Sequence, residues 1–161
     1  MEWKKATDVI LIASFVVLAV FVIIGLYQWI SRRSLKKVDK GLLFMPIPLA
    51  IMAAIYVLFD KFVVIATRPN GSGESSFPST HVMVVGTIFA LAAIALPRYI
   101  KSKTTCALLD FVMLVLFVLV CVGRVAANMH WVTDIIGGAA FAVVFAIIYY
   151  CLIRKRKAKN E

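Results

Sequence analysis

The sequence predicts an all-α integral membrane protein, a single bundle of about five transmembrane helices. Of its 161 residues, 63% are hydrophobic and only 16% are charged, whereas soluble domains are about half apolar and about a quarter charged. The mean hydropathy is +0.96. The length suits one domain, and no polar stretch is long enough to fold separately, so residues 1–161 are expected to form a single domain.

Five apolar runs predict the helices, since each is close to the roughly 17 to 25 residues that cross a bilayer. They cover about residues 9–30, 42–59, 79–96, 105–122 and 131–153. The first run is long and lacks a convincing small-residue cleavage site, so it is expected to be a retained helix and not a signal peptide. Pro46 and Pro48 lie near the start of the second run, where a kink or late start is tolerated. Pro97 closes the third run.

The loop charges predict the orientation, because Lys and Arg accumulate on the cytoplasmic side of a membrane. Of the 18 Lys and Arg residues, 13 follow the first, third or fifth run. They are Arg32, Arg33, Lys36, Lys37, Lys40, Arg98, Lys101, Lys103, Arg154, Lys155, Arg156, Lys157 and Lys159. The N-terminus is therefore expected outside and the C-terminus in the cytoplasm, with anionic lipids attracted to the basic loops.

The net charge of +10 does not predict a nucleic-acid partner, because no basic amphipathic helix or stacking motif accompanies it. The three cysteines Cys106, Cys121 and Cys151 lie inside apolar runs at no metal-ligand spacing. Neither a disulfide nor a metal site is expected.

Three polar clusters interrupt the apolar chain, and the first pairs Lys61 with Arg68-Pro69. An irregular turn over the six residues between the two cations could bring both to one anion. Asp60 is adjacent to Lys61, so a salt bridge at the membrane edge is the alternative, because cations at helix ends commonly reach back to the interface.

The second cluster is Phe77-Pro78-Ser79-Thr80-His81, where a Gly-rich loop enters the third run. Backbone N–H groups at a helix N-terminus attract phosphate. Ser79 could instead serve only as an N-cap and Pro78 only as a helix-start proline. His81 strengthens the functional interpretation, because ionisable groups inside a membrane are usually functional.

The third cluster contains Arg124, His130 and Asp134. His130 and Asp134 are four residues apart at the start of the fifth run and therefore share a helical face. The carboxylate could accept from one imidazole nitrogen and leave the other free to attack, as in activated nucleophiles. An ordinary helix pair is the alternative. Arg124 ends the fourth run and could reach the same pocket.

Together the clusters resemble, in order and spacing, the three-part signature of the type 2 phosphatidic acid phosphatase superfamily, which is related to vanadium haloperoxidases. A lysine, six residues and Arg-Pro correspond to Lys61 through Arg68-Pro69, and Pro-Ser-Gly-His corresponds to Pro78-Ser79-Thr80-His81. Ser-Arg, five residues, His, three residues and Asp correspond to Gly123-Arg124 through His130 and Asp134. Thr80 and Gly123 depart from the glycine and serine of the signature.

The resemblance implies that His130 attacks phosphorus to form a phosphohistidine, while His81 protonates the leaving oxygen and Asp134 orients His130. Water would then hydrolyse the phosphohistidine. The residues that it implies for phosphate binding are Lys61, Arg68, Ser79, Thr80 and Arg124. Family members need no metal or other cofactor, and no carboxylate cluster here offers Mg²⁺ a site.

The predicted topology places all three clusters on the non-cytoplasmic face of a multi-pass cell-membrane protein, where the head group of a lipid phosphate substrate could enter. The small size, minimal loops and outward site resemble undecaprenyl diphosphate phosphatases. A phosphatidic acid or phosphatidylglycerol phosphate phosphatase is the alternative. Another class of function is a non-catalytic membrane scaffold or an anion transporter, although a transporter would more usually show repeats or interrupted helices.

Overall fold

Helices make up almost all of the computed structural model, which describes residues 2–155. The order is α1 (Glu2–Arg32), η1 (Leu35–Lys37), α2 (Lys40–Phe44), α3 (Pro46–Lys61), α4 (Thr80–Ala95), η2 (Leu96–Arg98), α5 (Lys103–Ala126) and α6 (Val132–Lys155). Within this described part, the extended pairing consists of one isolated antiparallel bridge between Thr67 and Ser75. The basic residues Arg156, Lys157 and Lys159 of the predicted cytoplasmic tail lie outside the described residues.

Five segments are long and apolar enough to cross a membrane, which confirms the predicted all-α bundle of five spans. The second span is divided at Met45, immediately before Pro46, so α2 and α3 are separate helices. This division agrees with the kink predicted for that position, because proline lacks the N–H that a continuous helix needs.

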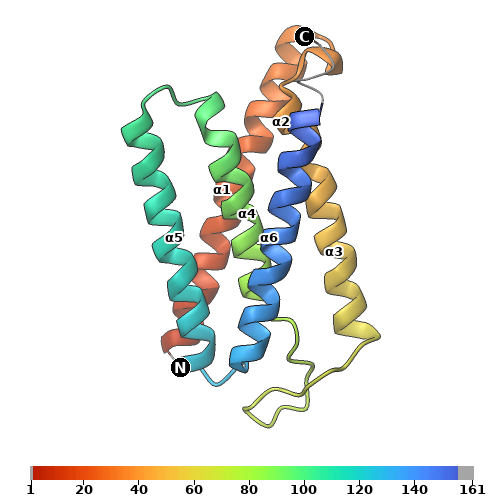
Figure 1. The fold of residues 1–161 in the computed structure, drawn as a ribbon, viewed down its shortest axis with the longest axis vertical. Helices are drawn as coiled ribbons and strands as arrows, with labels where there is room; N and C mark the ends of the chain where they lie inside the picture. Colours follow the sequence, from red (N-terminus) through yellow and green to blue (C-terminus); the bar gives the residue numbers. More distant parts are fainter. Residues whose placement is uncertain (1, 156–161) are drawn as a thin grey trace.

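The centre of the bundle is α4, in which 11 of 16 residues are buried (Figure 1). Helix α6 packs closely against the start of α4, and this contact positions the first turn of α6. A Cβ at Gly138 of α6 would lie only 2.8 Å from the backbone oxygen of Ser79, so a larger residue would push the two helices apart. At the same contact the Ser79 N–H donates to the Asp134 carbonyl oxygen at 3.1 Å. The second and third sequence clusters are thereby joined through the backbone.

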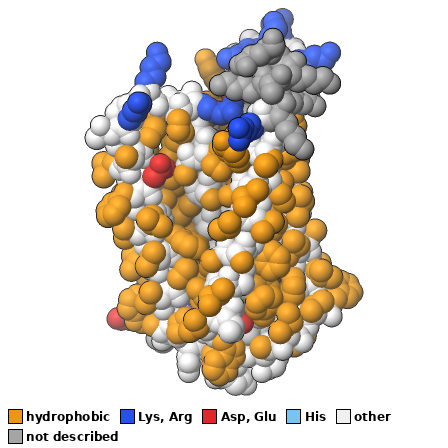
Figure 2. Space-filling model, in the orientation of Figure 1, with side chains coloured by type: hydrophobic (Ala, Val, Ile, Leu, Met, Phe, Trp, Pro, Cys, Tyr) orange, Lys and Arg blue, Asp and Glu red, His pale blue; other side chains and the backbone are white. Residues whose placement is uncertain are grey.

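The two ends of the bundle differ in character. The N-terminus, the α3–α4 loop and the α5–α6 connection lie together at one end, while the α1–α2 and α4–α5 connections lie at the other (Figure 1). On the face seen in Figure 2, Lys and Arg gather at this second end. The sequence clusters and the basic loops therefore occupy opposite ends. Which end faces the cytoplasm stays a prediction from the loop charges.

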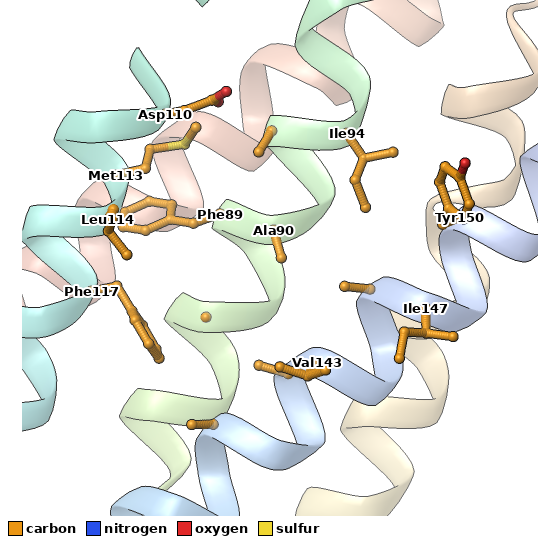
Figure 3. A pocket seen from close by; sticks show the side chains of 15 residues that line it. Phe89, Ala90, Ile94, Asp110, Met113, Leu114, Phe117, Val143, Ile147 and Tyr150 are labelled. Carbon is orange, nitrogen blue, oxygen red and sulfur yellow. The ribbon is translucent and has the colours of Figure 1, made fainter. Parts of the chain in front are cut away.

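A groove of about 480 Å³ runs between α4, α5 and α6 on the flank of the bundle (Figure 3). Its lining is almost entirely apolar and includes Phe89, Phe117 and Val143, with Asp110 of α5 at one margin. The residues of the three sequence clusters do not line it. This groove is therefore separate from the residues of the three clusters.

Candidate active site

Most of the residues predicted for the site lie at the end of the bundle that contains the N-terminus and the α3–α4 loop. They belong to that loop, to the ends of α4 and α5, and to the start of α6 and the connection before it. Four of them are almost fully buried although they are polar: Ser79, Arg124, His130 and Asp134 are between 0% and 4% exposed. Buried charged groups are costly unless they are paired or serve a function. The burial of this set therefore marks a built polar site.

Ser76 holds the ring of His130 in place. The Nδ1 atom of His130 donates to the Ser76 carbonyl oxygen at 2.8 Å. The nearest oxygen of Asp134 lies 3.6 Å from Nδ1, so the expected direct imidazole–carboxylate hydrogen bond is not what the structure contains. Asp134 accepts instead from the Ser76 hydroxyl and from the Trp131 N–H. It therefore fixes the turn that carries His130.

The hydrogen bond to Ser76 has a chemical consequence for His130. A proton on Nδ1 leaves Nε2 as the nitrogen with the free lone pair. Burial lowers the pKa of His130 to about 4, and the nearby positive charges of Arg124 and Arg68 lower it as well, although the Ser76 carbonyl and Asp134 act in the opposite direction. At neutral pH the imidazole is therefore uncharged and nucleophilic.

Three buried donors beside His130 have no hydrogen-bond partner within the described part of the chain: Nε of Arg68, Nε of Arg124 and Oγ of Ser79. Buried polar groups are almost always hydrogen-bonded. Ser79 precedes α4 at the N-cap position, yet its side chain makes no capping bond. An oxyanion with several acceptor oxygens would satisfy donors of this kind.

A small cavity of about 30 Å³ lies next to Arg68 and His130. Arg68, Thr80 and His130 line it, together with Asp60 and apolar side chains of α3 and α4. Thr80 is the first residue of α4, so the cavity opens at a helix N-terminus, where N–H groups and the helix dipole favour an anion.

Lys61 does not join this group. Its ammonium pairs with Asp60 at 2.9 Å and its side chain is 69% exposed. The turn after α3 therefore does not bring Lys61 and Arg68 to one anion, which corrects the expectation for the first cluster. The salt bridge at the membrane edge, given above as the alternative, is what forms. Arg68 has its own partner, Glu74, at 2.6 Å.

Packing against α1 accounts for one departure from the signature. A Cβ at Gly123 would lie 2.6 Å from the Thr7 side chain and 3.2 Å from the Trp3 ring. A serine at this position would collide with the first turns of α1. Glycine at position 123 therefore allows α1 to pack beside Arg124.

The sequence analysis missed Asp8 of α1. One of its carboxylate oxygens lies 2.8 Å from Nε2 of His81 and 3.5 Å from an Nη atom of Arg124. Asp8 is separated from both residues by more than 70 positions, so no local spacing connects them. The available signal was a single acidic residue near the start of an apolar run, because ionisable groups in such segments are usually functional.

Comparisons with known proteins identify the family of the chain. The sequence profile of the PAP2 superfamily matches residues 61–158. The chain is 32% identical over 77 residues to a lipid A 1-phosphatase from Rhizobium johnstonii, a match that covers 48% of this chain and 28% of that protein. The chain thus spans little more than a quarter of the length of this curated relative.

The fold is shared with a solved structure, that of a transmembrane PAP2-type phosphatidylglycerolphosphate phosphatase from Bacillus subtilis. The TM-score is 0.67 at 22% identity, and the match covers 95% of this chain and 75% of the other. Because the family profile spans more than half of the chain and includes all three clusters, this five-span membrane protein belongs to the PAP2 superfamily.

Proposed function

We propose that the protein is an integral-membrane lipid phosphatase that works through a phosphohistidine on His130. The observation that carries the proposal is the buried, uncharged His130, whose Nδ1 is bound to Ser76 and whose ring is close enough to Arg124 and Arg68 for their charges to lower its pKa. Arg68, Arg124 and Ser79 each carry a buried donor without a partner among the described residues. A nucleophile surrounded by donors for an oxyanion is the arrangement that phosphoryl transfer needs.

The reaction has two steps. In the first, Nε2 of His130 forms a bond to phosphorus while the bond from phosphorus to the leaving oxygen breaks, and His81 gives that oxygen a proton. Arg68, Arg124, Ser79 and the N–H groups at the start of α4 bind the equatorial oxygens and offset their charge. In the second, the oxygen of a water molecule forms a bond to phosphorus while the bond from phosphorus to Nε2 of His130 breaks. His81 takes a proton from that water, and inorganic phosphate leaves.

Asp134 and Lys61 have less direct roles in this scheme. Asp134 orients His130 through Ser76 and the Trp131 backbone. Lys61 would have to leave Asp60 to touch the phosphate, so its contribution is expected to be the smallest of the predicted set.

The proposed substrate is a lipid phosphate, because the site lies at one end of five membrane spans, within reach of a head group at the bilayer surface. Both relatives are named for lipid phosphates, lipid A and phosphatidylglycerol phosphate. The sequence favours undecaprenyl diphosphate within this class, with phosphatidic acid or phosphatidylglycerol phosphate as the alternative. We place the site on the non-cytoplasmic face and the anionic lipids at the opposite, basic end.

The test is phosphate release by the purified protein in detergent. The substrates are undecaprenyl diphosphate, phosphatidic acid, phosphatidylglycerol phosphate and a water-soluble phosphate ester, and each is also incubated with His130→Ala as control. The proposal expects release from at least one lipid, faster than from the soluble ester, and no release by the variant. A folded wild-type protein that releases phosphate from none of them would instead support a scaffold or an anion transporter.

A further inference from the structure

Asp8 places a negative charge beside His81, the proposed acid, and not beside His130, the proposed nucleophile. Its carboxylate contacts His81 at 2.8 Å and Arg124 at 3.5 Å through the same oxygen, and its side chain is 43% exposed. Among the contacts of the described residues, those of His130 are with Ser76 and Asp134, not with Asp8. The carboxylate of Asp8 therefore stands next to the proposed acid.

The next step rests on the proposed function. In an in-line displacement the attacking and leaving atoms lie on opposite sides of phosphorus. With His130 attacking and His81 protonating the leaving oxygen, a group in contact with His81 lies on the leaving-group side. Asp8 is consequently positioned to interact with the leaving group.

Lipid phosphate monoesters and lipid diphosphates differ in the charge of the leaving group. Cleavage of a phosphate monoester breaks the bond to a carbon-linked oxygen and releases a neutral alcohol, which must receive a proton. Cleavage of the terminal phosphate of a diphosphate releases a lipid monophosphate, which carries negative charge and leaves readily without a proton.

A carboxylate next to the acid suits the first class. It holds the His81 ring through Nε2, and it repels no charge on a departing alcohol. The same carboxylate would repel a departing phosphate. Arg124, 3.5 Å from the same carboxylate, offsets part of this repulsion, and Lys61 relieves none of it, because Lys61 pairs with Asp60 and is mostly exposed.

We infer that Asp8 is a specificity-determining residue that directs the proposed phosphatase to lipid phosphate monoesters and against lipid diphosphates. Asp8 acts by its charge on the leaving group and by holding His81 in place. Within the lipid phosphates this assigns the monoester class, and it disfavours the undecaprenyl diphosphate that the sequence alone had favoured.

The experiment compares two substrates with the same prenyl chain, farnesyl monophosphate and farnesyl diphosphate, so that tail binding is matched. The ratio of kcat/KM for the monophosphate to that for the diphosphate is measured for wild type, Asp8→Asn and Asp8→Glu. Wild type is expected to prefer the monophosphate. In Asp8→Asn the ratio should fall by at least about tenfold, because like charges about 4 Å apart near a protein surface change an equilibrium by that much or more. Asp8→Glu should restore most of the preference.

Asp110→Asn is the matched control, since it makes the same chemical change on a membrane helix about 21 Å along α5 from Arg124. Its ratio should equal that of wild type. A wild type that cleaves the diphosphate faster, or an Asp8→Asn ratio within twofold of wild type, would overturn the role of Asp8 while leaving the phosphatase proposal intact. A wild type that cleaves neither substrate nor any lipid phosphate would overturn both. The wild-type preference remains a test even if Asp8→Asn does not fold.

Discussion

The two histidines of the site are held in contrasting ways. His130 is 4% exposed and its contacts come from nearby motif segments, the carbonyl of Ser76 and the turn that Asp134 fixes. His81 is partly exposed, and its ionic partner Asp8 comes from the distant helix α1. The attacking side of the proposed reaction is thus built within residues 61–158, the segment that the family profile matches. The leaving-group side depends on a residue outside it.

This difference indicates that the His130 side performs the chemistry common to all substrates, whereas the side around His81 and Asp8 determines which substrate is preferred. A buried nucleophile with a fixed tautomer suits phosphoryl transfer from any phosphate. The partly open side around His81 and Asp8 meets the variable part of the substrate. Changes on the His130 side should therefore reduce turnover of every substrate, whereas Asp8 should change the order of preference.

The largest effect is expected from His130→Ala. Removal of the nucleophile should lower kcat/KM at least about 10³-fold for all lipid phosphates, whatever leaves. Phosphate release gives the rate, and size-exclusion chromatography in detergent verifies the fold. Comparable losses for monophosphate and diphosphate would support the separation of the two sides, whereas a loss confined to one substrate would break it.

Arg124→Lys is expected to cost about 10²- to 10³-fold in kcat, because a guanidinium in contact with the transferring group is replaced by an ammonium with different geometry. Arg124 is buried and its Nε is unpartnered. Lysine cannot reproduce the planar set of N–H donors that the guanidinium presents. Steady-state kinetics separates kcat from KM. Unchanged kcat would show that Arg124 only anchors α1 through Asp8.

A smaller effect concerns pH. At pH 5.5 the lowered pKa of His130 should make its neutral fraction about tenfold larger than that of an ordinary imidazole. With an ordinary pKa of 6.5, an imidazole at pH 5.5 would be about nine-tenths protonated and unable to attack. The pKa of His130, lowered to about 4 by burial and by Arg124 and Arg68, keeps it neutral there. NMR of carbon-13-labelled histidine should show the His130 resonance changing as pH falls through about 4. A midpoint near 6.5 would contradict the buried environment.

The smallest effect is expected from Lys61→Ala. Its ammonium is mostly exposed and paired with Asp60, and exposed ion pairs contribute little. The change should lower kcat/KM at most about fivefold, in contrast to Arg124→Lys. A loss as large as that of Arg124→Lys would show that Lys61 leaves Asp60 during the reaction.

Much of the architecture followed from the sequence because apolar run length and loop charge are local properties. The five spans and the family were predicted and are confirmed. The spacing of His130 and Asp134 predicted a shared helical face, but α6 begins at Val132, so His130 lies in the connection before the helix. The orientation in the membrane and the single-domain assignment stay predictions.

Tertiary contacts account for what the sequence did not predict. Asp8 meets His81 only because α1 packs beside α4 and α5, with Gly123 making room for it. The spacing did not decide between Asp60 and a phosphate as the partner of Lys61, and in the structure the partner is Asp60. Ser76 was overlooked because its backbone carbonyl, which has no side-chain signature, makes the contact with His130.

The central claim is that phosphate passes through His130, and rapid-quench trapping tests it most directly. Wild-type protein mixed with a lipid phosphate monoester is stopped in alkali, in which phosphohistidine survives, and its peptides are analysed by mass spectrometry. The account predicts one phosphoryl group on the peptide that contains His130, absent from His130→Ala. Phosphate on a different residue, or continued turnover by His130→Ala, would contradict it.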